Sequence, residues 1–220
     1  MFVSAQPALF DRRDLQVQLV ADPEKQKRLD AFYTDPLLAD FCVAQLTDPR
    51  LLRSWLGLRS RVVEPSCGGG SFVEALLKRT PNVHAVDVDP DAAGLHIAPT
   101  HDVSDWLDWT PAEEDVVDWV VGNPPFGDAE AHLRHALSIA RVGVAFLLRQ
   151  GFVSSKERRP FFAEFPGAAR VDLLERPSFT GDGKTDMYDY AFLVWLKGHQ
   201  GPGKWVTASW ERHRVVAGRP

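Results

Sequence analysis

The chain has 220 residues, with 25 Lys and Arg against 30 Asp and Glu, a formal net charge of −5. This balance excludes a uniformly basic surface that would coat nucleic acid, although it leaves room for a local basic face. Two cysteines exclude a disulfide framework, and no Cys/His cluster has zinc spacing, so we expect no metal. The sequence shows no signal-peptide pattern, and no apolar run approaches the ~18 residues of a membrane span. We therefore expect a cytoplasmic protein with no membrane partner.

Strand and helix patterns alternate along the chain. Apolar residues at helical spacing predict helices over 34–46, 71–79, 129–140 and 155–165, with only a short helical turn over 91–94. Apolar runs bounded by turn residues predict strands over 61–64, 83–88, 97–101, 116–121, 142–148, 170–176 and 188–196. The alternation predicts an α/β fold with a doubly wound, mostly parallel seven-stranded sheet. The last two strands have no helix between them, which predicts an antiparallel edge hairpin.

A glycine-rich turn follows the first of these strands, with the sequence Glu64-Pro65-Ser66-Cys67-Gly68-Gly69-Gly70. Glycines allow the backbone to turn tightly and to approach a ligand closely. The dinucleotide spacing GxGxxG and the Lys-Ser/Thr of a P-loop are both absent. An acid at the strand end suits an ammonium-bearing ligand better than a phosphate. A plain strand-to-helix turn is the alternative interpretation.

The next predicted strand also ends in acids. Asp87 lies 23 residues beyond Glu64, where a carboxylate can accept hydrogen bonds from both ribose hydroxyls. Asp89 precedes Pro90, so it suits either a helix N-cap or a contact with a bound adenine.

The most specific pattern is Asn123-Pro124-Pro125-Phe126, directly after the fourth strand. The two prolines restrict the backbone and favour an extended Asn123. Pro124 has a carbonyl but no N–H, so the loop offers an amide oxygen and a carbonyl side by side. Two acceptors fit the two hydrogens of a planar NH₂ group and free its lone pair for attack. A simple proline turn is the alternative for this loop taken alone.

In this order, the three segments resemble known motifs. Glu64-Pro65, Cys67-Gly68 and Gly70 look like motif I of S-adenosylmethionine-dependent amino-methyltransferases, Asp87 like motif II and Asn123–Phe126 like motif IV. Phe32–Pro36, with Asp35 as an extra residue, resembles the motif X that comes first in gamma-order DNA adenine methyltransferases. Residues 146–165 and 176–190 are similar to small phage and prophage adenine methyltransferases. The resemblance covers residues 30–197.

The resemblance implies a Rossmann-like class I methyltransferase domain over residues 30–197, between an extension over 1–29 and a tail over 198–220 that packs on the domain or on substrate. It implies a site for S-adenosylmethionine: Glu64, Pro65, Cys67, Gly68 and Gly70 lie at the methionine part, and Tyr33 and Thr34 cover its carboxylate end. Asp87 binds the ribose, Asp102 and Asp89 lie at the adenine, and Asn123 borders the cofactor. In catalysis, Asn123 and Pro124 accept the target amine's hydrogens, Pro125 stiffens the loop, and Phe126 stacks on the flipped base.

The implied reaction is methylation of the N6 amine of adenine in DNA. RNA bases and a protein glutamine amide remain open as targets, and a catalytically silent binding subunit ranks last, because motifs I and IV are both intact. Lys156, Arg158, Arg159 and Lys184 are the candidate nucleic-acid contacts, although a charge run is also typical of a solvated face. No separate target-recognition domain follows the hairpin, so we expect a short or relaxed recognition site. The oligomeric state stays open.

Overall fold

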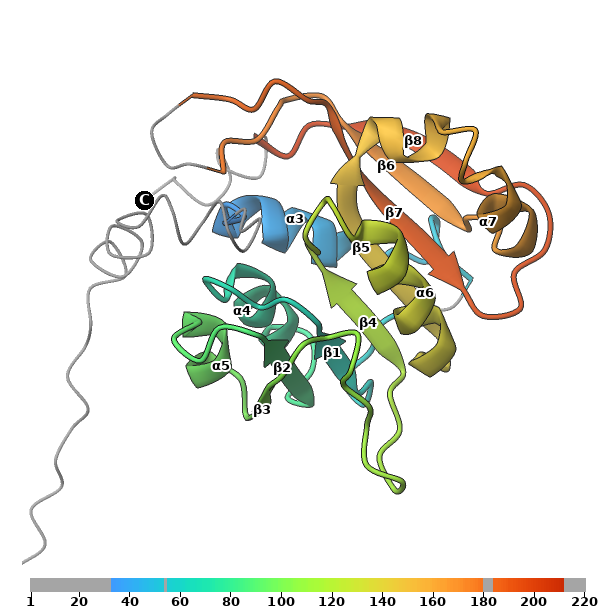
Figure 1. Ribbon diagram of the computed structural model, residues 1–220. Helices are drawn as coiled ribbons and strands as arrows, with labels where there is room; N and C mark the ends of the chain where they lie inside the picture. The colour runs from blue at the N-terminus through green and yellow to red at the C-terminus, as the bar shows by residue number, and fades with distance from the viewer. Residues whose placement is uncertain (1–32, 54, 180–183, 212–220) are drawn as a thin grey trace, which may run out of the picture.

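The computed structural model describes residues 33–53, 55–179 and 184–211 (Figure 1). The predicted extension over 1–29 lies outside the described residues, as does the tail beyond 211. Within the described part, no helix is both long enough and apolar enough to cross a membrane.

One mixed sheet forms the centre of the molecule, with strand order β3-β2-β1-β4-β5-β7-β6-β8. The strands are β1 (Val62–Glu64), β2 (Val83–Asp87), β3 (Thr100–Val103), β4 (Trp119–Gly122), β5 (Gly143–Arg149), β6 (Ala169–Leu173), β7 (Tyr190–Leu196) and β8 (Lys204–Ala208). The helices are α3 (Pro36–Gln45), α4 (Ser71–Leu77), α5 (Ala93–Ile97), α6 (Ala129–Ile139), η1 (Gln150–Ser154, a 3₁₀ helix) and α7 (Arg159–Glu164). The first five strands are parallel, and β7 runs antiparallel between β5 and β6.

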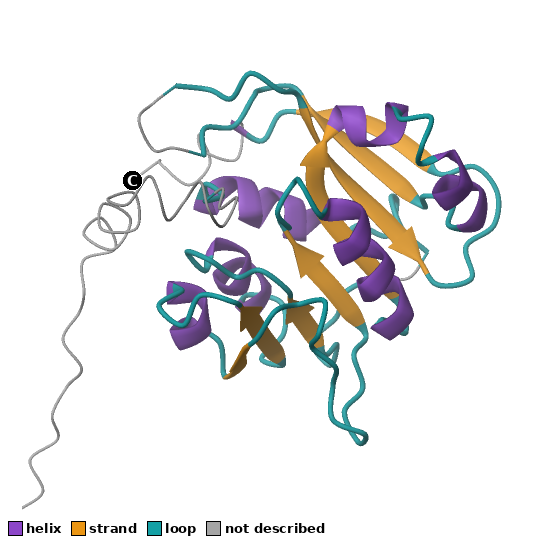
Figure 2. Ribbon diagram, in the orientation of Figure 1, coloured by secondary structure: helices purple, strands orange, loops and turns teal. Residues whose placement is uncertain are grey.

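Helices lie on both faces of the sheet (Figure 2). Alternating side chains of the strands build an apolar core on each face. On one face, Val62, Ala85 and Val121 pack with α3, α4 and α5. On the other face, Val63, Val120 and Phe146 pack with α6 and α7. Because the strand order reverses between β1 and β4, their carboxyl ends border a crevice at the edge where such folds bind ligands.

The predicted doubly wound sheet is confirmed, with one strand more than expected. The tail supplies β8, which pairs with β6 in parallel and forms a new edge. Trp210 is buried and donates through Nε1 to the carbonyl of Glu175. Trp205 stays 68% exposed, with the Arg170 guanidinium over its ring. The described part of the tail thus packs on the domain.

Several predicted boundaries are wrong by three residues or more. The strands expected over 116–121 and 170–176 are β4 at Trp119–Gly122 and β6 at Ala169–Leu173. Two further differences lie at the carboxyl edge of the sheet or next to it. The edge strand expected over 97–101 is instead β3 at Thr100–Val103, because the preceding residues continue the short helix α5. The helix expected over 155–165 begins only at Arg159, where Pro160 suits the first turn, and η1 occupies the segment after β5. Both shifts change which side chains reach the carboxyl edge of the sheet.

Candidate functional site

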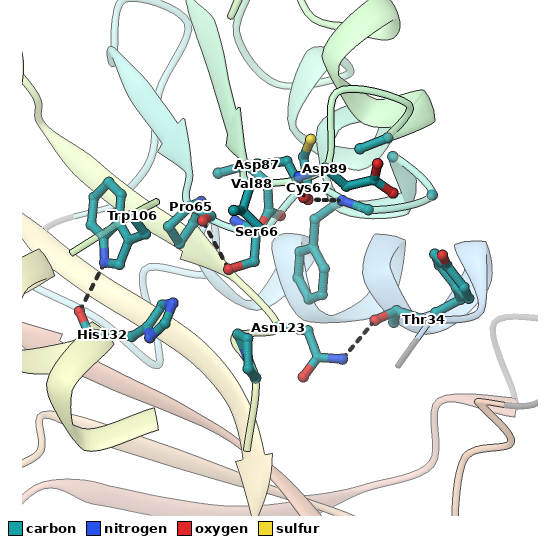
Figure 3. Close-up of a pocket in the computed structure, with 18 of the residues that line it drawn as sticks. Thr34, Pro65, Ser66, Cys67, Asp87, Val88, Asp89, Trp106, Asn123 and His132 are labelled. Carbon is teal, nitrogen blue, oxygen red and sulfur yellow. Dashed lines mark hydrogen bonds between the residues drawn. The ribbon is translucent and has the colours of Figure 1, made fainter. Parts of the chain in front are cut away.

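A cavity of about 350 Å³ opens at the carboxyl ends of β1, β2 and β4 (Figure 3). Its lining includes most of the predicted site residues: Tyr33, Thr34, Glu64, Pro65, Cys67, Gly68, Gly70, Asp87, Asp89, Asn123 and Pro125. Residues far apart in the sequence meet here because parallel strands present their ends at one edge. Within the described ranges, no group of three or more His, Cys, Asp and Glu side chains could hold a metal ion.

The glycine turn brings the backbone to the cavity wall. Gly70 has a φ of +85° at the start of α4, and a Cβ there would lie 2.5 Å from Ile97 Cδ1. Gly68 has a φ of +41°, and its missing Cβ would face the Tyr33 ring at 3.4 Å. Both positions therefore require glycine. At these glycines, the main chain itself borders the cavity, with no side chain over it.

Glu64 is 1% exposed and is one of the residues that line the cavity. The Ser66 N–H donates to Oε1 at 3.3 Å. Burial raises the pKa of Glu64 well above the ordinary 4.5, and the neighbouring Asp87 raises it further, although the Ser66 hydrogen bond opposes both. A Cβ on Gly122 would lie 2.7 Å from Glu64 Cδ and overlap Oε1. The bare backbone of β4 thus makes room for this carboxyl group.

Asp87 holds the glycine turn as well as lining the cavity. Its Oδ2 accepts from the Gly68 N–H at 2.8 Å and its Oδ1 accepts from the Asp89 N–H at 2.9 Å. Burial raises the pKa of Asp87, and these two hydrogen bonds oppose the shift. Cys67 is buried beside it, and burial raises the pKa of its thiol, so the sulfur stays protonated. A protonated thiol is a poor nucleophile, so Cys67 is not suited to covalent catalysis.

The amide of Asn123 is oriented by Thr34, in the segment before α3. Asn123 Nδ2 donates to Thr34 Oγ1 at 3.1 Å (Figure 3). The Thr34 carbonyl in turn accepts from Ser71 Oγ at 2.6 Å, at the start of α4. The motif after β4 is therefore tied to the glycine turn through one threonine. Because Nδ2 points to Thr34, the amide oxygen is the end directed elsewhere in the site.

Phe126 does not line this cavity. It lines a second one of about 370 Å³, together with Arg149, Phe152, Arg158 and Tyr188. Pro124, which follows Asn123 in the same loop, is buried. The loop Asn123–Phe126 thus contributes to both cavities: its first half faces the glycine turn, and its aromatic ring faces the end of β5 and the residues before β7.

Asp102 is not brought to the site. It lines a third cavity at the amino ends of the strands, where its Oδ2 accepts from Trp109 Nε1 at 2.8 Å and lies 3.1 Å from His84 Nε2. The resemblance placed this acid at the cofactor's adenine, and the position of Asp102 does not agree with that placement. Beyond the end of β3 at Val103, Asp105 is an acid that does line the first cavity.

Further lining residues escaped the sequence analysis. Ser66, Val88, Trp106, Leu107, Asp128 and His132 all border the first cavity. Trp106 is 2% exposed, and its Nε1 donates to the His132 carbonyl at 3.2 Å. Burial lowers the pKa of His132, which favours the neutral ring. Trp106 directly follows Asp105, so a correct end for β3 would have pointed to it.

The candidate nucleic-acid contacts separate into two kinds. Lys156 and Arg159 are exposed. Arg158 is half-buried: its guanidinium lies 4.3 Å from the Phe152 ring centroid, and Nε lies 3.4 Å from Glu130 Oε2. Lys184 is exposed, just after the undescribed residues 180–183. Lys156 and Arg159 are therefore better placed to meet a polyanion than Arg158.

Asp89 does not cap a helix. Its Oδ1 accepts from the Asp91 N–H at 3.1 Å, and the N-cap residue of α5 is Ala92. Of the two interpretations of Asp89, the cap is therefore wrong, and the contact with a bound molecule stays a prediction.

No protein-family model and no curated protein matches the sequence. Solved structures do match. A putative class I S-adenosylmethionine-dependent methyltransferase from Listeria monocytogenes is similar at 13% identity over 94% of this chain and 75% of that one, with a TM-score of 0.63. A putative RNA methyltransferase from Pyrococcus horikoshii is similar at 16% identity over 84% of this chain and 98% of that one, also with a TM-score of 0.63.

The methyltransferase subunit of a type I restriction-modification system from Streptococcus thermophilus is similar at 13% identity and a TM-score of 0.62, over 83% of this chain. The match spans 49% of that subunit. This chain has the class I methyltransferase fold.

Proposed function

We propose that this chain transfers a methyl group from S-adenosylmethionine to the exocyclic N6 amine of adenine in DNA. The observation that carries the proposal is the position of one loop between two cavities. Asn123 and Pro125 line the cavity at the glycine turn, and Phe126 lines the second cavity. A loop so placed can contact a methyl donor on one side and a target amine on the other.

The first cavity fits S-adenosylmethionine. When bound, this cofactor supplies a methyl group activated by a sulfonium. The Glu64 carboxyl group, admitted by the missing Cβ of Gly122, suits the methionine ammonium. Asp87 lies at the end of β2, where it can accept from the ribose hydroxyls. At the far end, Val88, Trp106 and Leu107 offer apolar walls for the adenine, and Asp105 offers an acceptor for its amine.

At the target, Asn123 and Pro124 act together. The Asn123 side-chain oxygen and the Pro124 carbonyl accept the two amine hydrogens and draw electron density onto the nitrogen. Thr34 Oγ1 accepts a hydrogen bond from Asn123 Nδ2, and this bond holds the amide with its oxygen directed away from Thr34. Such a preorganised group gains most where charge develops in the transition state. No residue of this chain needs to form a covalent intermediate.

The order of motifs X, I, II and IV supports DNA as the substrate, because it resembles that of gamma-order DNA adenine methyltransferases. Basic side chains support a nucleic acid in general: Arg149 and Arg158 line the second cavity, and Lys156 and Arg159 are exposed after η1. The similar structures include both a type I restriction-modification methyltransferase subunit and a putative RNA methyltransferase, so they agree with either nucleic acid.

The described part of the tail packs on the domain through β8 and Trp210, which leaves it little surface for base contacts. We therefore propose a short recognition site.

The proposal is tested by incubating the full chain with isotope-labelled S-adenosylmethionine and, separately, duplex DNA, single-stranded DNA, RNA and a glutamine-containing protein. After digestion, mass spectrometry should find N6-methyladenine in DNA. Label in RNA or in protein, with none in DNA, would contradict the proposed substrate while retaining the chemistry. Absence of label from every substrate would contradict both.

Cofactor affinity should rise with pH. An ammonium group prefers the ionised Glu64, but burial raises the pKa of this carboxyl well above its usual range in the free protein. Where the pH lies below that raised pKa, binding has to release a proton, so the apparent affinity increases as the pH rises towards it. The same shift makes the unliganded fold less stable as the pH rises, because ionising Glu64 costs more in the folded state.

Calorimetric titration with S-adenosylmethionine in two buffers of different ionisation enthalpy measures this proton release. In Glu64→Gln, the affinity should fall about tenfold or more, and the release due to this group should disappear. Asp87 also has a raised pKa, so any proton release that survives in Glu64→Gln belongs to it. An unchanged affinity in Glu64→Gln would remove Glu64 from the ammonium site.

A further inference from the structure

An exposed aromatic ring lies at the second cavity. Tyr188 is 45% exposed, and the guanidinium carbon of Arg149 lies 4.1 Å from the Tyr188 ring centroid. Both residues line the cavity. Because the guanidinium covers one face of the ring, the exposed surface is the opposite face and the ring edge. Tyr188 therefore presents a flat aromatic surface to a molecule that approaches this cavity.

The backbone that carries this ring is held on both sides. Asp186 Oδ1 accepts from the Tyr188 N–H at 3.1 Å, and Asp186 Oδ2 accepts from Tyr190 Oη at 2.9 Å. Beyond the ring, the Asp189 carbonyl accepts from the Gln150 N–H at 2.8 Å, at the end of β5. An exposed ring on such a fixed segment has little freedom left to lose when a ligand stacks on it.

Arg149 supports the ring from behind. It is the last residue of β5 and pairs with Tyr190 of β7, and its Nε lies 3.5 Å from Tyr190 Oη. Its guanidinium carbon also lies 4.5 Å from the Phe126 ring centroid. The cation is thus packed between two rings. Aromatic rings that hold single-stranded nucleic acid by stacking commonly gain from such a neighbouring arginine.

The same packing determines which base can lie on the exposed face of Tyr188. The Tyr188 ring and the Arg149 guanidinium both lie between that face and Phe126. A base on Tyr188 is therefore two stacked groups away from the loop Asn123–Phe126, to which the proposed function assigns the target amine. Such a base is a neighbour of the target in the strand, and not the target itself.

We propose that Tyr188, backed by Arg149, is a stacking platform for an unpaired base next to the target adenine. The inference rests on the proposed function and adds a substrate class to it, single-stranded DNA. In a duplex, the neighbours of a flipped base stay paired and stacked inside the helix. In a single strand, every base has a π face available for an aromatic side chain. A platform of this kind adds affinity without reading sequence, in agreement with a short recognition site.

The test uses single-stranded thymine oligonucleotides with one central adenine and the fluorescent base 2-aminopurine directly before or after it. Saturating S-adenosylhomocysteine fills the first cavity without allowing methyl transfer. In the parent chain, binding should quench the fluorescence at one of the two positions, because that base stacks on Tyr188. Tyr188→Leu should remove the quenching and weaken binding about 5- to 150-fold, whereas Tyr188→Phe should retain both.

Met187→Ala is the matched control. Met187 precedes Tyr188, lines the same cavity and is 73% exposed, but it has no ring. The quenching should therefore survive in this variant. Quenching that is absent from the parent chain at both positions, or that persists in Tyr188→Leu, would overturn the proposal.

A double-mutant cycle separates stacking from a merely structural role of the ring. An oligonucleotide with an abasic site at the quenched position has no base to stack. The parent chain should bind it about 5- to 150-fold more weakly than the intact oligonucleotide, whereas Tyr188→Leu should bind the two equally. If the abasic site weakens binding by the same factor in both chains, the ring does not contact this base and the platform is wrong.

The strand preference provides a second measurement. The parent chain should methylate the single strand with a higher kcat/KM than the duplex of the same sequence. Tyr188→Leu should lower kcat/KM on the single strand and leave it almost unchanged on the duplex. An equal loss on both substrates would place the ring at the target base and contradict the proposal.

Failure of this inference is distinguishable from failure of the proposed function. If the parent chain methylates DNA but the abasic site costs both chains the same affinity, the platform is wrong and the methyltransferase proposal stands. If quenching depends on Tyr188 but no DNA is methylated, the platform stands and the proposed reaction is wrong. If the parent chain methylates no nucleic acid and binds neither oligonucleotide, both are wrong.

Discussion

Replacing Asn123 by alanine is expected to reduce methyl transfer by about 100-fold or more, while the affinity for the cofactor stays within a few-fold. Asn123 Oδ1 is proposed to accept a hydrogen of the target amine, and this interaction strengthens as the nitrogen attacks. Preorganised hydrogen-bonding groups that act on developing charge contribute about 100- to 1000-fold in rate. Single-turnover rates at saturating cofactor, together with calorimetric titration of the cofactor, measure the two effects separately.

The hydrogen bond from Asn123 Nδ2 to Thr34 Oγ1 provides a graded comparison. Thr34→Val removes the acceptor that orients the amide but leaves the Thr34 carbonyl for Ser71 Oγ. It should slow transfer less than Asn123→Ala. Asn82→Ala, at an exposed asparagine beside the third cavity, should leave the rate unchanged. A near-parental rate in Asn123→Ala would remove this residue from the reaction.

The part of the site that could be predicted depends on strand ends. Glu64, Asp87 and Asn123 each follow an apolar run, and a parallel sheet gathers the ends of its strands at one edge. Their convergence therefore followed from the order of elements alone. The first cavity contains all three, along with the turn residues Gly68 and Gly70.

The parts that could not be predicted depend on registers. The resemblance assigned Asp102 to the adenine. The end of a short exposed strand is poorly marked by side-chain pattern, so Asp105, three positions further on, was not singled out. Arg149 and Tyr188 line one cavity, at the place where β5 and β7 pair with Arg149 opposite Tyr190. Two separate apolar runs do not encode that register, and so neither Arg149 nor Tyr188 was singled out.

The tail shows the same limit for pairing partners. Lys204–Ala208 carries an alternation that suits an edge strand, but nothing local says that β6 is its partner. From the sequence, this tail, with Trp205 and Trp210, could pack either on the domain or on substrate. In the structure, Trp210 is buried, and the Arg170 guanidinium lies over the Trp205 ring. A tryptophan can serve either in packing or in contact with substrate, and tertiary packing, not residue type, determines which.

Replacing Gly122 by alanine should damage both stability and cofactor binding. A Cβ there would lie 2.7 Å from Glu64 Cδ and overlap Oε1, so Glu64 or the end of β4 has to shift. Overpacking of this kind costs about 1–3 kcal/mol, which corresponds to a fall in melting temperature of roughly 2–12 °C for a chain of this size. A displaced Glu64 no longer meets the ammonium, so cofactor affinity should fall about tenfold or more. Thermal unfolding and calorimetric titration measure the two losses.

The cause of the Gly122 effect is separable by a double-mutant cycle. In a Glu64→Ala background the clash is gone, so adding Gly122→Ala should cost little further stability, whereas the cofactor affinity should stay low. Gly57→Ala is the matched control, because a Cβ at Gly57 meets nothing within 4 Å. If Gly122→Ala destabilises the Glu64→Ala chain as much as the parent, the clash is not the reason. The loss of stability would then come from the backbone of β4. The missing side chain at Gly122 would not explain how Glu64 is positioned for the cofactor.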